Sequence, residues 1–247
     1  MSPIQNRRKA LVTGAAKRLG NVFALHLAGR GFDVGIHANT SVEEANAATA
    51  AVRAMGSRSV FTLADLRDEA AVARSVADTA RALGGIDTLV LSASSFPSDQ
   101  VDELDSVTFL DTLAVNAVGP FLFAKHALPF LKQNPLGRII VLADVHADRP
   151  LRGFLAYSAA KAALVSITKS LAREWAPRIA VNAILPGSVL PPDDFDPAAL
   201  EALRKRTPTG RLGTPSDLLS VLDFLVDAPA QITGLLIPVD GGRSLAP

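Results

Sequence analysis

Two polar side chains four residues apart could form a proton-transfer pair. In the segment "AYSAAKAA", Tyr157 and Lys161 are one helical turn apart, so on a helix both lie on the same face. A lysine beside a tyrosine hydroxyl stabilises the phenolate and lowers the pKa of the tyrosine, which can then act as an acid near neutral pH. A solvated helix face is the alternative, because this spacing is common by chance. Because the pair follows the fifth predicted strand, we favour a catalytic role over a solvated helix face.

The segment "VTGAAKRLG", residues 12–20, predicts an anion-binding turn. An apolar strand ends at a turn with Gly14 and leads into a helix, whose free N–H groups and dipole attract phosphate. Gly20 lets that helix pack close to the strand. Arg18 stands between them, where such turns usually have glycine, and Lys17 adds a second positive charge. A purely structural turn is the alternative, because glycines also end strands.

The end of the second predicted strand indicates which dinucleotide would bind. A cofactor without a 2′-phosphate needs an acidic residue there to hold the ribose hydroxyls. This sequence has Ala38 instead, followed by the hydrogen-bonding side chains of Asn39, Thr40 and Ser41. Together with the charges of Lys17 and Arg18, the pattern predicts a 2′-phosphate site, and so NADPH rather than NADH. The three polar residues could also cap the next helix, which is compatible with that site.

Alternating strands and helices must position these residues. The predicted strands are residues 9–14, 32–37, 59–66, 86–94, 138–144, 178–187 and 235–242, and the main predicted helices are 20–30, 41–56, 68–83, 106–133 and 156–176. Ser41 and Glu44 have the spacing of a capping box. The strands are near-continuous apolar runs, which predicts a buried parallel sheet. We expect one doubly wound, Rossmann-type α/β domain over residues 1–247, with seven parallel strands and a substrate lid at about 188–212.

Composition excludes several classes of protein. The net charge of +1 gives no reason to expect a nucleic-acid or membrane partner. The sequence contains no cysteine, which excludes disulfides, thiolate catalysis and cysteine-bound zinc. The N-terminal segment has basic residues but no long apolar run, so no secretory signal is predicted. No apolar run is judged long enough to span a bilayer, and the expected location is the cytoplasm.

The ordered motifs resemble those of the short-chain dehydrogenase/reductase family, from Lys9 to Leu245. They are "TGAAKRLG", "ADL", "VNAVGPF", "YSAAK", "VNAILPG" and "ITGLLIPVDGGRSL". The resemblance implies NADPH or NADP as the cofactor and Asp144, Tyr157, Lys161 and Asn116 as the catalytic residues, with Asn116 holding a water chain to Lys161. The implied cofactor-binding residues are Gly14, Lys17, Arg18, Leu19, Gly20, Asn39, Thr40, Ser41, Asp65, Leu66, Ser92, Ala93, Ser94, Tyr157, Lys161, Pro186, Gly187 and Ser188.

Three departures from the family pattern are similar to one subgroup, the pteridine reductases and bacterial dihydromonapterin reductases. Asp144 lies thirteen residues before Tyr157, where the family usually has a serine; "LSAS" with Ser95 and Phe96 replaces "NNAG"; and Arg18 replaces the middle glycine. In that subgroup the arginine contacts cofactor phosphate and pterin, and the aromatic ring and the nicotinamide sandwich the pterin. The implied substrate-binding residues are Arg18, Ser94, Phe96, Asp144 and Tyr157. The subgroup often has an arginine where this chain has Thr40.

Several of these residues have simpler interpretations. Asp144 could cap a loop or pair with Arg149 or Arg152, and Phe96 could be part of the core. The remaining candidates are histidines without metal-ligand spacing and a group of aspartates that only superficially looks like a metal cluster, so no metal site is predicted. They are the histidines His37, His126 and His146, expected to be structural or exposed, and the aspartates Asp193, Asp194 and Asp196, expected in a solvated acidic loop.

The sequence also leaves function and assembly open. The preferred hypothesis is reduction of a dihydropterin-like heterocycle, and the alternatives are a reductase of carbonyl compounds such as 3-oxoacyl thioesters and a non-catalytic nucleotide sensor. Retention of the Tyr157–Lys161 pair argues against the sensor. The resemblance implies a homotetramer, which the small residues Ala159, Ala160 and Ala163 would permit. The same alanines could instead pack inside one subunit.

Overall fold

The apolar runs form one parallel sheet in the computed structural model, which describes residues 7–191 and 195–245. The strands are β1 (Lys9–Val12), β2 (Asp33–Ala38), β3 (Ser59–Leu63), β4 (Thr88–Leu91), β5 (Gly137–Leu142), β6 (Ile179–Pro186) and β7 (Leu236–Val239). Their order across the sheet is β3-β2-β1-β4-β5-β6-β7, and every neighbouring pair is parallel. The predicted Rossmann-type domain with seven parallel strands is confirmed.

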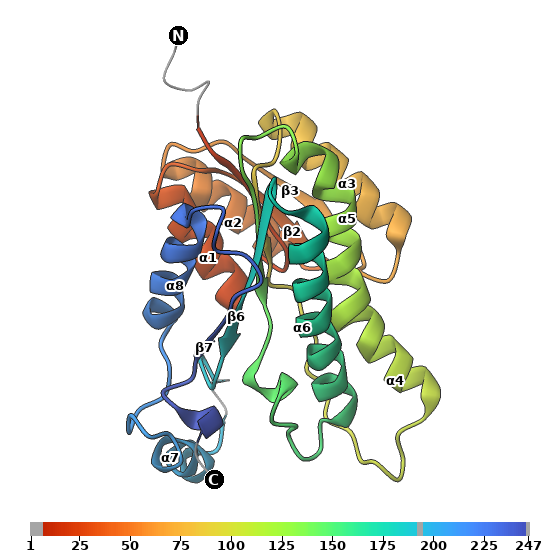
Figure 1. The fold of residues 1–247 in the computed structure, drawn as a ribbon, viewed down its shortest axis with the longest axis vertical. Helices are drawn as coiled ribbons and strands as arrows, with labels where there is room; N and C mark the ends of the chain where they lie inside the picture. The colour runs from red at the N-terminus through yellow and green to blue at the C-terminus, as the bar shows by residue number, and fades with distance from the viewer. Residues whose placement is uncertain (1–6, 192–194, 246–247) are drawn as a thin grey trace.

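Helices cover both faces of this sheet (Figure 1). One layer contains α3 (Glu69–Leu83), α4 (Ser106–Leu113), α5 (Gly119–Leu131) and α6 (Leu155–Trp175), and the other contains α1 (Arg18–Gly29), α2 (Val42–Ala54) and α8 (Pro215–Asp227). Successive strand residues serve opposite cores, with Leu11 packing in the α3–α5–α6 layer and Val12 in the α1–α2–α8 layer. This two-sided burial explains why the strands lack polar alternation.

The order of the strands fixes where a ligand can bind. β1 lies between β2 and β4, so the chain leaves β1 toward one edge of the sheet and β4 toward the other. In doubly wound sheets this change of direction opens a crevice beyond the carboxyl ends of the strands. The glycine turn after β1 and the serine-rich segment after β4 therefore lie next to each other at that crevice.

The helix predicted over 106–133 is found over residues 106–131, but it is not α-helical throughout. A π-helical segment, Ala114–Val118, separates α4 from α5 and carries Asn116. Such segments replace the regular bonding pattern of the helix and are frequent at functional sites. By length and composition, Ser106–Leu131 is also apolar enough to cross a membrane, so the expectation that no run is long enough is wrong on that criterion. Phe123, Ala127 and Leu131 lie in the protein core, which identifies α5 as a core helix.

Local signals at the starts of α2 and α8 also differ from expectation. Ser41 is the N-cap residue of α2, but its side chain makes no capping bond, so the predicted capping box is wrong. The Glu44 carboxylate pairs with Lys17 instead. The capping box is found at α8, a helix that the sequence analysis missed, where Thr214 and Asp217 bond reciprocally.

The predicted lid is described at residues 188–191 and 195–212. It contains α7 (Pro197–Lys205), which has no buried residue and lies at the end of the molecule near the C-terminus (Figure 1). Asp196 caps α7 by accepting hydrogen bonds from two of its backbone N–H groups. Asp193 and Asp194 lie outside the described residues. Within the described ranges, no group of acidic or histidine side chains could hold a metal ion.

Candidate active site

A cleft of about 590 Å³ opens at the carboxyl ends of β1, β2 and β4, at the position that the strand order predicts. Its walls are Gly14, Lys17, Arg18, Leu19, Gly20, His37, Asn39, Asp65, Leu66, Arg67, Ser92, Ala93, Ser94, Ser95, Phe96, Asp111, Val115 and Leu142. Most of the predicted cofactor-binding residues are in this set. The predicted residues outside it are Thr40, Ser41, Asn116, Asp144, Tyr157, Lys161, Pro186, Gly187 and Ser188.

The glycine turn is fixed by close packing. Gly14 has a φ of +65°, and a Cβ there would lie 2.8 Å from the Cα of Ala93. The Thr13 hydroxyl accepts hydrogen bonds from the N–H groups of Ser92 (2.9 Å) and Ala93 (3.0 Å), which joins the turn to the end of β4. Lys17, the N-cap residue of α1, provides no side-chain cap, so the first-turn N–H groups lack that partner. Such N–H groups are suited to bind phosphate.

Arg18 occupies the usual glycine position and adopts the left-handed backbone conformation that favours glycine. Its φ is +51°, in the left-handed region that costs an L-residue about 1–2 kcal/mol. The side chain leaves the turn, and its Nη2 donates a 2.5 Å hydrogen bond to the carbonyl of Leu190. Arg18 therefore links the glycine turn to the segment after β6, and its charge stays on the wall of the cleft.

His37, on β2, is hydrogen-bonded to the same turn. Its Nδ1 accepts a hydrogen bond from the N–H of Gly14 (3.3 Å), and its Nε2 lies 3.0 Å from the carbonyl of Ala64, so the proton is on Nε2. Burial lowers its pKa to about 4, which keeps it neutral. The expectation of a structural histidine is met, but its bonds to segments that follow β1 and β3 could not be predicted from local sequence.

Charged groups gather at the end of the cleft beyond β2 and β3. Lys17 Nζ lies 2.6 Å from Glu44 Oε1. The guanidinium of Arg67 donates to both oxygens of Asp65 and, at 2.8 Å, to Asp111. Arg67 lowers the pKa of Asp65 to about 2, so this carboxylate stays ionised. Asp65 was expected to bind the cofactor, and Arg67 and Asp111 are wall residues that the sequence analysis missed.

The proton-transfer residues adjoin the cleft. Tyr157 donates a 2.7 Å hydrogen bond from its hydroxyl to Asp144 Oδ2, and Asp144 Oδ1 accepts one from the N–H of His146 at 2.8 Å. The carboxylate thus caps its loop and also faces the tyrosine. Burial, and then the charge of Asp144, raise the pKa of Tyr157. In this state the expectation of a lowered tyrosine pKa is wrong, because burial of the hydroxyl and the neighbouring Asp144 carboxylate outweigh any effect of the lysine.

Lys161 is buried directly below Tyr157 on α6. Its Nζ donates a 3.1 Å hydrogen bond to the carbonyl of Leu142 and lies 5.5 Å from the centre of the tyrosine ring. Burial lowers the pKa of Lys161 to about 8, with Asp144 opposing the shift. A lysine in this state can change its protonation near physiological pH.

Asn116 holds the segment after β4. Its Oδ1 accepts hydrogen bonds from the Ser94 hydroxyl (2.6 Å) and the Ser95 N–H (3.1 Å). Its Nδ2 donates to the Ser95 hydroxyl and to the carbonyl of Thr112. The π-helical segment therefore presents an amide that positions the serine-rich turn. The expected water chain to Lys161 stays a prediction.

Phe96 forms an aromatic platform beside the tyrosine. Its side chain is 54% exposed, so the alternative that it belongs to the core is wrong. The ring stacks on Phe154 with centroids 4.2 Å apart and an angle of 13°, and it meets Tyr157 edge-on at 4.6 Å. Phe154 was not predicted as a site residue. It is the N-cap residue of α6, and only the fold shows that it supports Phe96.

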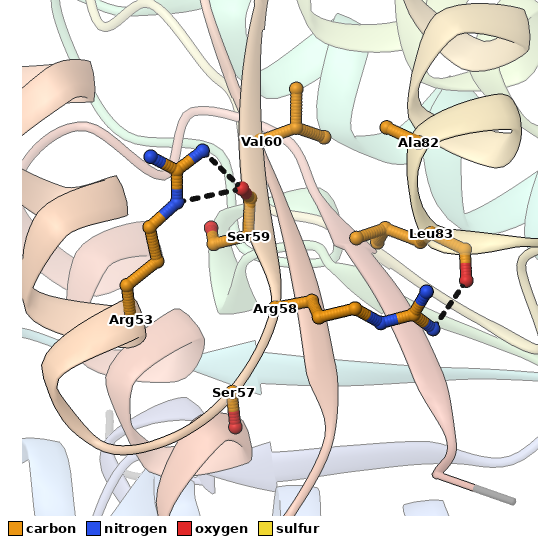
Figure 2. Close-up of a pocket in the computed structure, with 7 residues that line it drawn as sticks. All are labelled: Arg53, Ser57, Arg58, Ser59, Val60, Ala82 and Leu83. Atoms are coloured by element: carbon orange, nitrogen blue, oxygen red, sulfur yellow. Dashed lines mark hydrogen bonds between the residues drawn. The ribbon is translucent and has the colours of Figure 1, made fainter. Parts of the chain in front are cut away.

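A second cavity, of about 490 Å³, lies at the opposite end of the sheet, beside the start of β3 (Figure 2). Its two arginines are engaged by backbone carbonyls: Arg53 donates to Ser59 and Arg58 to Leu83. It contains neither a phosphate-binding turn nor a proton-transfer pair. The cleft at the carboxyl ends is therefore the candidate active site.

The residues present fit a phosphorylated dinucleotide. The uncapped first turn of α1 and the two cations beside it suit phosphate, and Ala38 leaves the end of β2 without a repelling carboxylate. The cleft runs from this charged end to the segment that carries Ser94 and Phe96, next to Tyr157. This arrangement can hold a long anionic ligand with its far end against an acid–base pair.

Comparison with known proteins supports the same assignment. The family model described as enoyl-(acyl carrier protein) reductase matches residues 14–244. A short-chain dehydrogenase/reductase of Armillaria gallica is 34% identical over 97% of this chain and 97% of its own. The 3-oxoacyl-(acyl-carrier-protein) reductase FabG of Aggregatibacter actinomycetemcomitans is 31% identical over 94% of this chain and 97% of its own.

Among solved structures, the NADP complex of FolM, alternative dihydrofolate reductase 1 from Brucella canis, has a TM-score of 0.90 at 31% identity, over 97% of this chain and 94% of that one. Whole-chain similarity at this level, to a family model, to curated relatives and to a solved structure, agrees with the motifs and with the geometry of the cleft. The chain belongs to the short-chain dehydrogenase/reductase family of NAD(P)-dependent oxidoreductases.

Proposed function

We propose that the protein is an NADPH-dependent reductase of a flat, nitrogen-rich heterocycle, a dihydropterin being the preferred class. The observation that carries the proposal is the hydrogen bond from Tyr157 to Asp144, made beside the exposed ring of Phe96. A carboxyl group can accept from the ring N–H and amino donors of a pterin or, when protonated, donate to its ring nitrogens. An aromatic face gives the heterocycle a stacking surface.

The cofactor supplies hydride from its nicotinamide. The first turn of α1 would bind its diphosphate, and Asn39, Thr40 and Ser41 would hydrogen-bond the 2′-phosphate, with Lys17 and Arg18 adding positive charge beside it. Asp65 and Leu66 would border the adenine. The remaining predicted contacts would lie toward the nicotinamide: Ser92, Ala93, Ser94, Pro186, Gly187 and Ser188. Support comes from the missing acid at Ala38 and from the NADP bound in the Brucella relative.

Protons would be delivered by Tyr157 and Asp144. A tyrosine with a raised pKa keeps its proton until a substrate atom with developing negative charge accepts it. Lys161, buried one turn below, stabilises the phenolate that is left. Asp144 relays the proton or holds the heterocycle. Ser94 belongs to the same group, because its side chain also hydrogen-bonds Tyr157 and opposes the rise of the tyrosine pKa.

A carbonyl reductase is the second candidate, since FabG is similar over nearly the whole chain. In that case an ionised Asp144 would oppose the negative charge that develops on a substrate oxygen. This argument favours the heterocycle. A non-catalytic nucleotide sensor is disfavoured, because it would not need a buried tyrosine–lysine pair.

The test is a turnover screen of the purified protein with NADPH against dihydropterins, dihydrofolate and 3-oxoacyl thioesters. We expect dihydropterin to give the highest kcat/KM. Faster reduction of the thioester would select the carbonyl function. NADPH turnover with none of them would overturn both.

We also propose a single domain over residues 1–247, with 188–212 as the lid, a cytoplasmic location and a homotetramer. Val107 and Leu110 on α4 are 74% and 62% exposed, which favours a covered face in an assembly. Ala160 is buried within its own chain, while Ala159 and Ala163 are half-buried. Sedimentation that shows only a monomer at micromolar concentration would contradict the assembly.

A further inference from the structure

The contact between Lys17 and Glu44 joins two elements that border the cleft. Lys17 is the N-cap residue of α1 and lies on the cleft wall, and Glu44 is in the first turn of α2, just after the end of β2. Their charged atoms are 2.6 Å apart, and both side chains are about half exposed. Lys17 is the main cause of the lowered pKa of Glu44, so this carboxylate is ionised at neutral pH.

The other cations of the cleft are directed elsewhere. The Arg18 guanidinium donates to the Leu190 carbonyl. Arg67 is held between Asp65 and Asp111. Lys17 therefore carries the charge that faces the end of β2, where Ala38 leaves room for a 2′-phosphate, and in this structure Glu44 neutralises it.

We propose that Glu44 is a specificity-determining residue that competes with the 2′-phosphate of the cofactor for Lys17. The proposal rests on the proposed use of NADPH. When a dinucleotide with a 2′-phosphate binds, the phosphate takes the ammonium group and the ion pair opens. When NADH binds, the pair stays closed, because a ribose hydroxyl does not displace a carboxylate.

The free energies of the two contacts permit this competition for Lys17. An exposed ion pair contributes little in water, so a phosphate of higher charge can replace the carboxylate. The displaced Glu44 stays close enough to repel the phosphate. Both effects weaken binding of NADPH and leave binding of NADH unaffected. Glu44 thus lowers a cofactor preference that the surrounding residues create.

The experiment measures dissociation constants by titration of NADPH and NADH, with no substrate present. In Glu44→Gln we expect NADPH to bind roughly three- to tenfold more tightly and NADH to bind within about twofold of wild type. Glu43→Gln is the matched control, since this exposed neighbour has the same charge and lies in the same turn. It should change NADPH affinity much less, and added salt should reduce the gain in Glu44→Gln.

A double-mutant cycle separates competition from a general charge effect. In a Lys17→Met background, Glu44→Gln should lose most of its effect on NADPH. Weaker NADPH binding in Glu44→Gln would mean that the glutamate positions the lysine, and an effect equal to that of Glu43→Gln would mean bulk electrostatics; either result overturns the proposal. If wild type binds NADH more tightly than NADPH, the proposed cofactor fails first, which distinguishes the two failures.

Discussion

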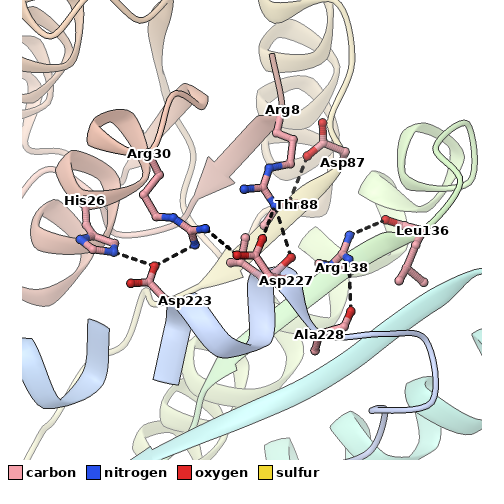
Figure 3. A network of polar contacts seen from close by, with 11 residues as sticks. Arg8, His26, Arg30, Asp87, Thr88, Leu136, Arg138, Asp223, Asp227 and Ala228 are labelled. Atoms are coloured by element: carbon pink, nitrogen blue, oxygen red, sulfur yellow. Dashed lines mark hydrogen bonds and ion pairs between the residues drawn. The ribbon is translucent and has the colours of Figure 1, made fainter. Parts of the chain in front are cut away.

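At the amino ends of the strands, one group of ionised side chains is matched by partners of opposite charge. Arg30 bridges Asp223 (2.8 Å) and Asp227 (2.6 Å), and Arg8 also binds Asp227, at 2.7 Å (Figure 3). These contacts join α1 and α8 to the segment before β1. Each partner favours the charged form of the other, so the pKa of Arg30 is raised and that of Asp227 is lowered.

At the carboxyl ends, burial pushes side chains away from their charged forms. The pKa of Tyr157 is raised, that of Lys161 is lowered to about 8 and that of His37 to about 4. Desolvation is the largest cause in all three. The ion pairs of Arg30 and Arg8 therefore stabilise the fold, whereas the buried groups at the carboxyl edge can respond to the charge of a ligand.

The largest expected effect is at the tyrosine. Tyr157→Phe removes the acid while keeping the ring against Phe96, so kcat/KM with NADPH should fall by roughly 10²–10⁴-fold. The melting temperature should change little, because the ring stays buried. Steady-state kinetics and a thermal melt check both points. A variant that keeps its activity would show that the proton comes from another group.

A negative charge added at the carboxyl ends of the strands should change cofactor binding without destabilising the fold. In Ala38→Asp the new charge faces the predicted 2′-phosphate, so preference should shift toward NADH by on the order of 1–3 kcal/mol. The ratio of kcat/KM for the two cofactors measures the shift. Unchanged preference in a folded variant would place the 2′-phosphate away from the end of β2.

The pH profile should report Lys161. The ammonium is lost as pH rises through about 8, so kcat/KM should decline above that value, by about tenfold for each further pH unit. Because the pKa of Tyr157 is raised, the tyrosine does not produce this limb. A profile that stays flat well above this pH would show that the charge of Lys161 is not needed.

The smallest effect is expected at the amino edge. Asp227→Asn should destabilise the protein by about 1 kcal/mol, because the pairs are half-exposed and screened, and should leave kcat unchanged. A carboxylate with a lowered folded pKa contributes its stability above the ordinary value and loses it as pH falls through the folded value. The difference between the melting temperatures of wild type and variant should therefore vanish in acid. A loss of activity at neutral pH without a loss of stability would show that this ion-pair group at the amino edge also affects the active site.

Much of this contrast could be predicted from the sequence. Continuous apolar runs predict buried parallel strands, and the positions of Tyr157, Lys161 and Gly14 place them at one edge. Contacts between distant segments could not be predicted, such as Glu44 with Lys17 or Phe96 on Phe154. The strength of such contacts depends on distances that only the fold sets.

Local sequence also misled in two places. The run that includes Asn116 is typical of one long helix, but its side-chain bonds to Ser94 and Ser95 accompany a π-helical segment. The capping spacing was assigned to Ser41, while the box formed at Thr214. In both cases a partner outside the segment decides the local structure. Asn116 bonds to Ser94 and Ser95, and Glu44 pairs with Lys17.

The central claim is that Asp144 suits the active site to a nitrogen heterocycle, and Asp144→Ser tests it most directly. With NADPH, the account predicts that kcat/KM for a dihydropterin falls by roughly 10²-fold or more and that activity on simple carbonyl compounds is kept or increased. Asp148→Ser, in the same loop, should change neither. If Asp144→Ser reduces dihydropterin as well as wild type does, Asp144 serves only its loop, and the carbonyl function replaces the one proposed.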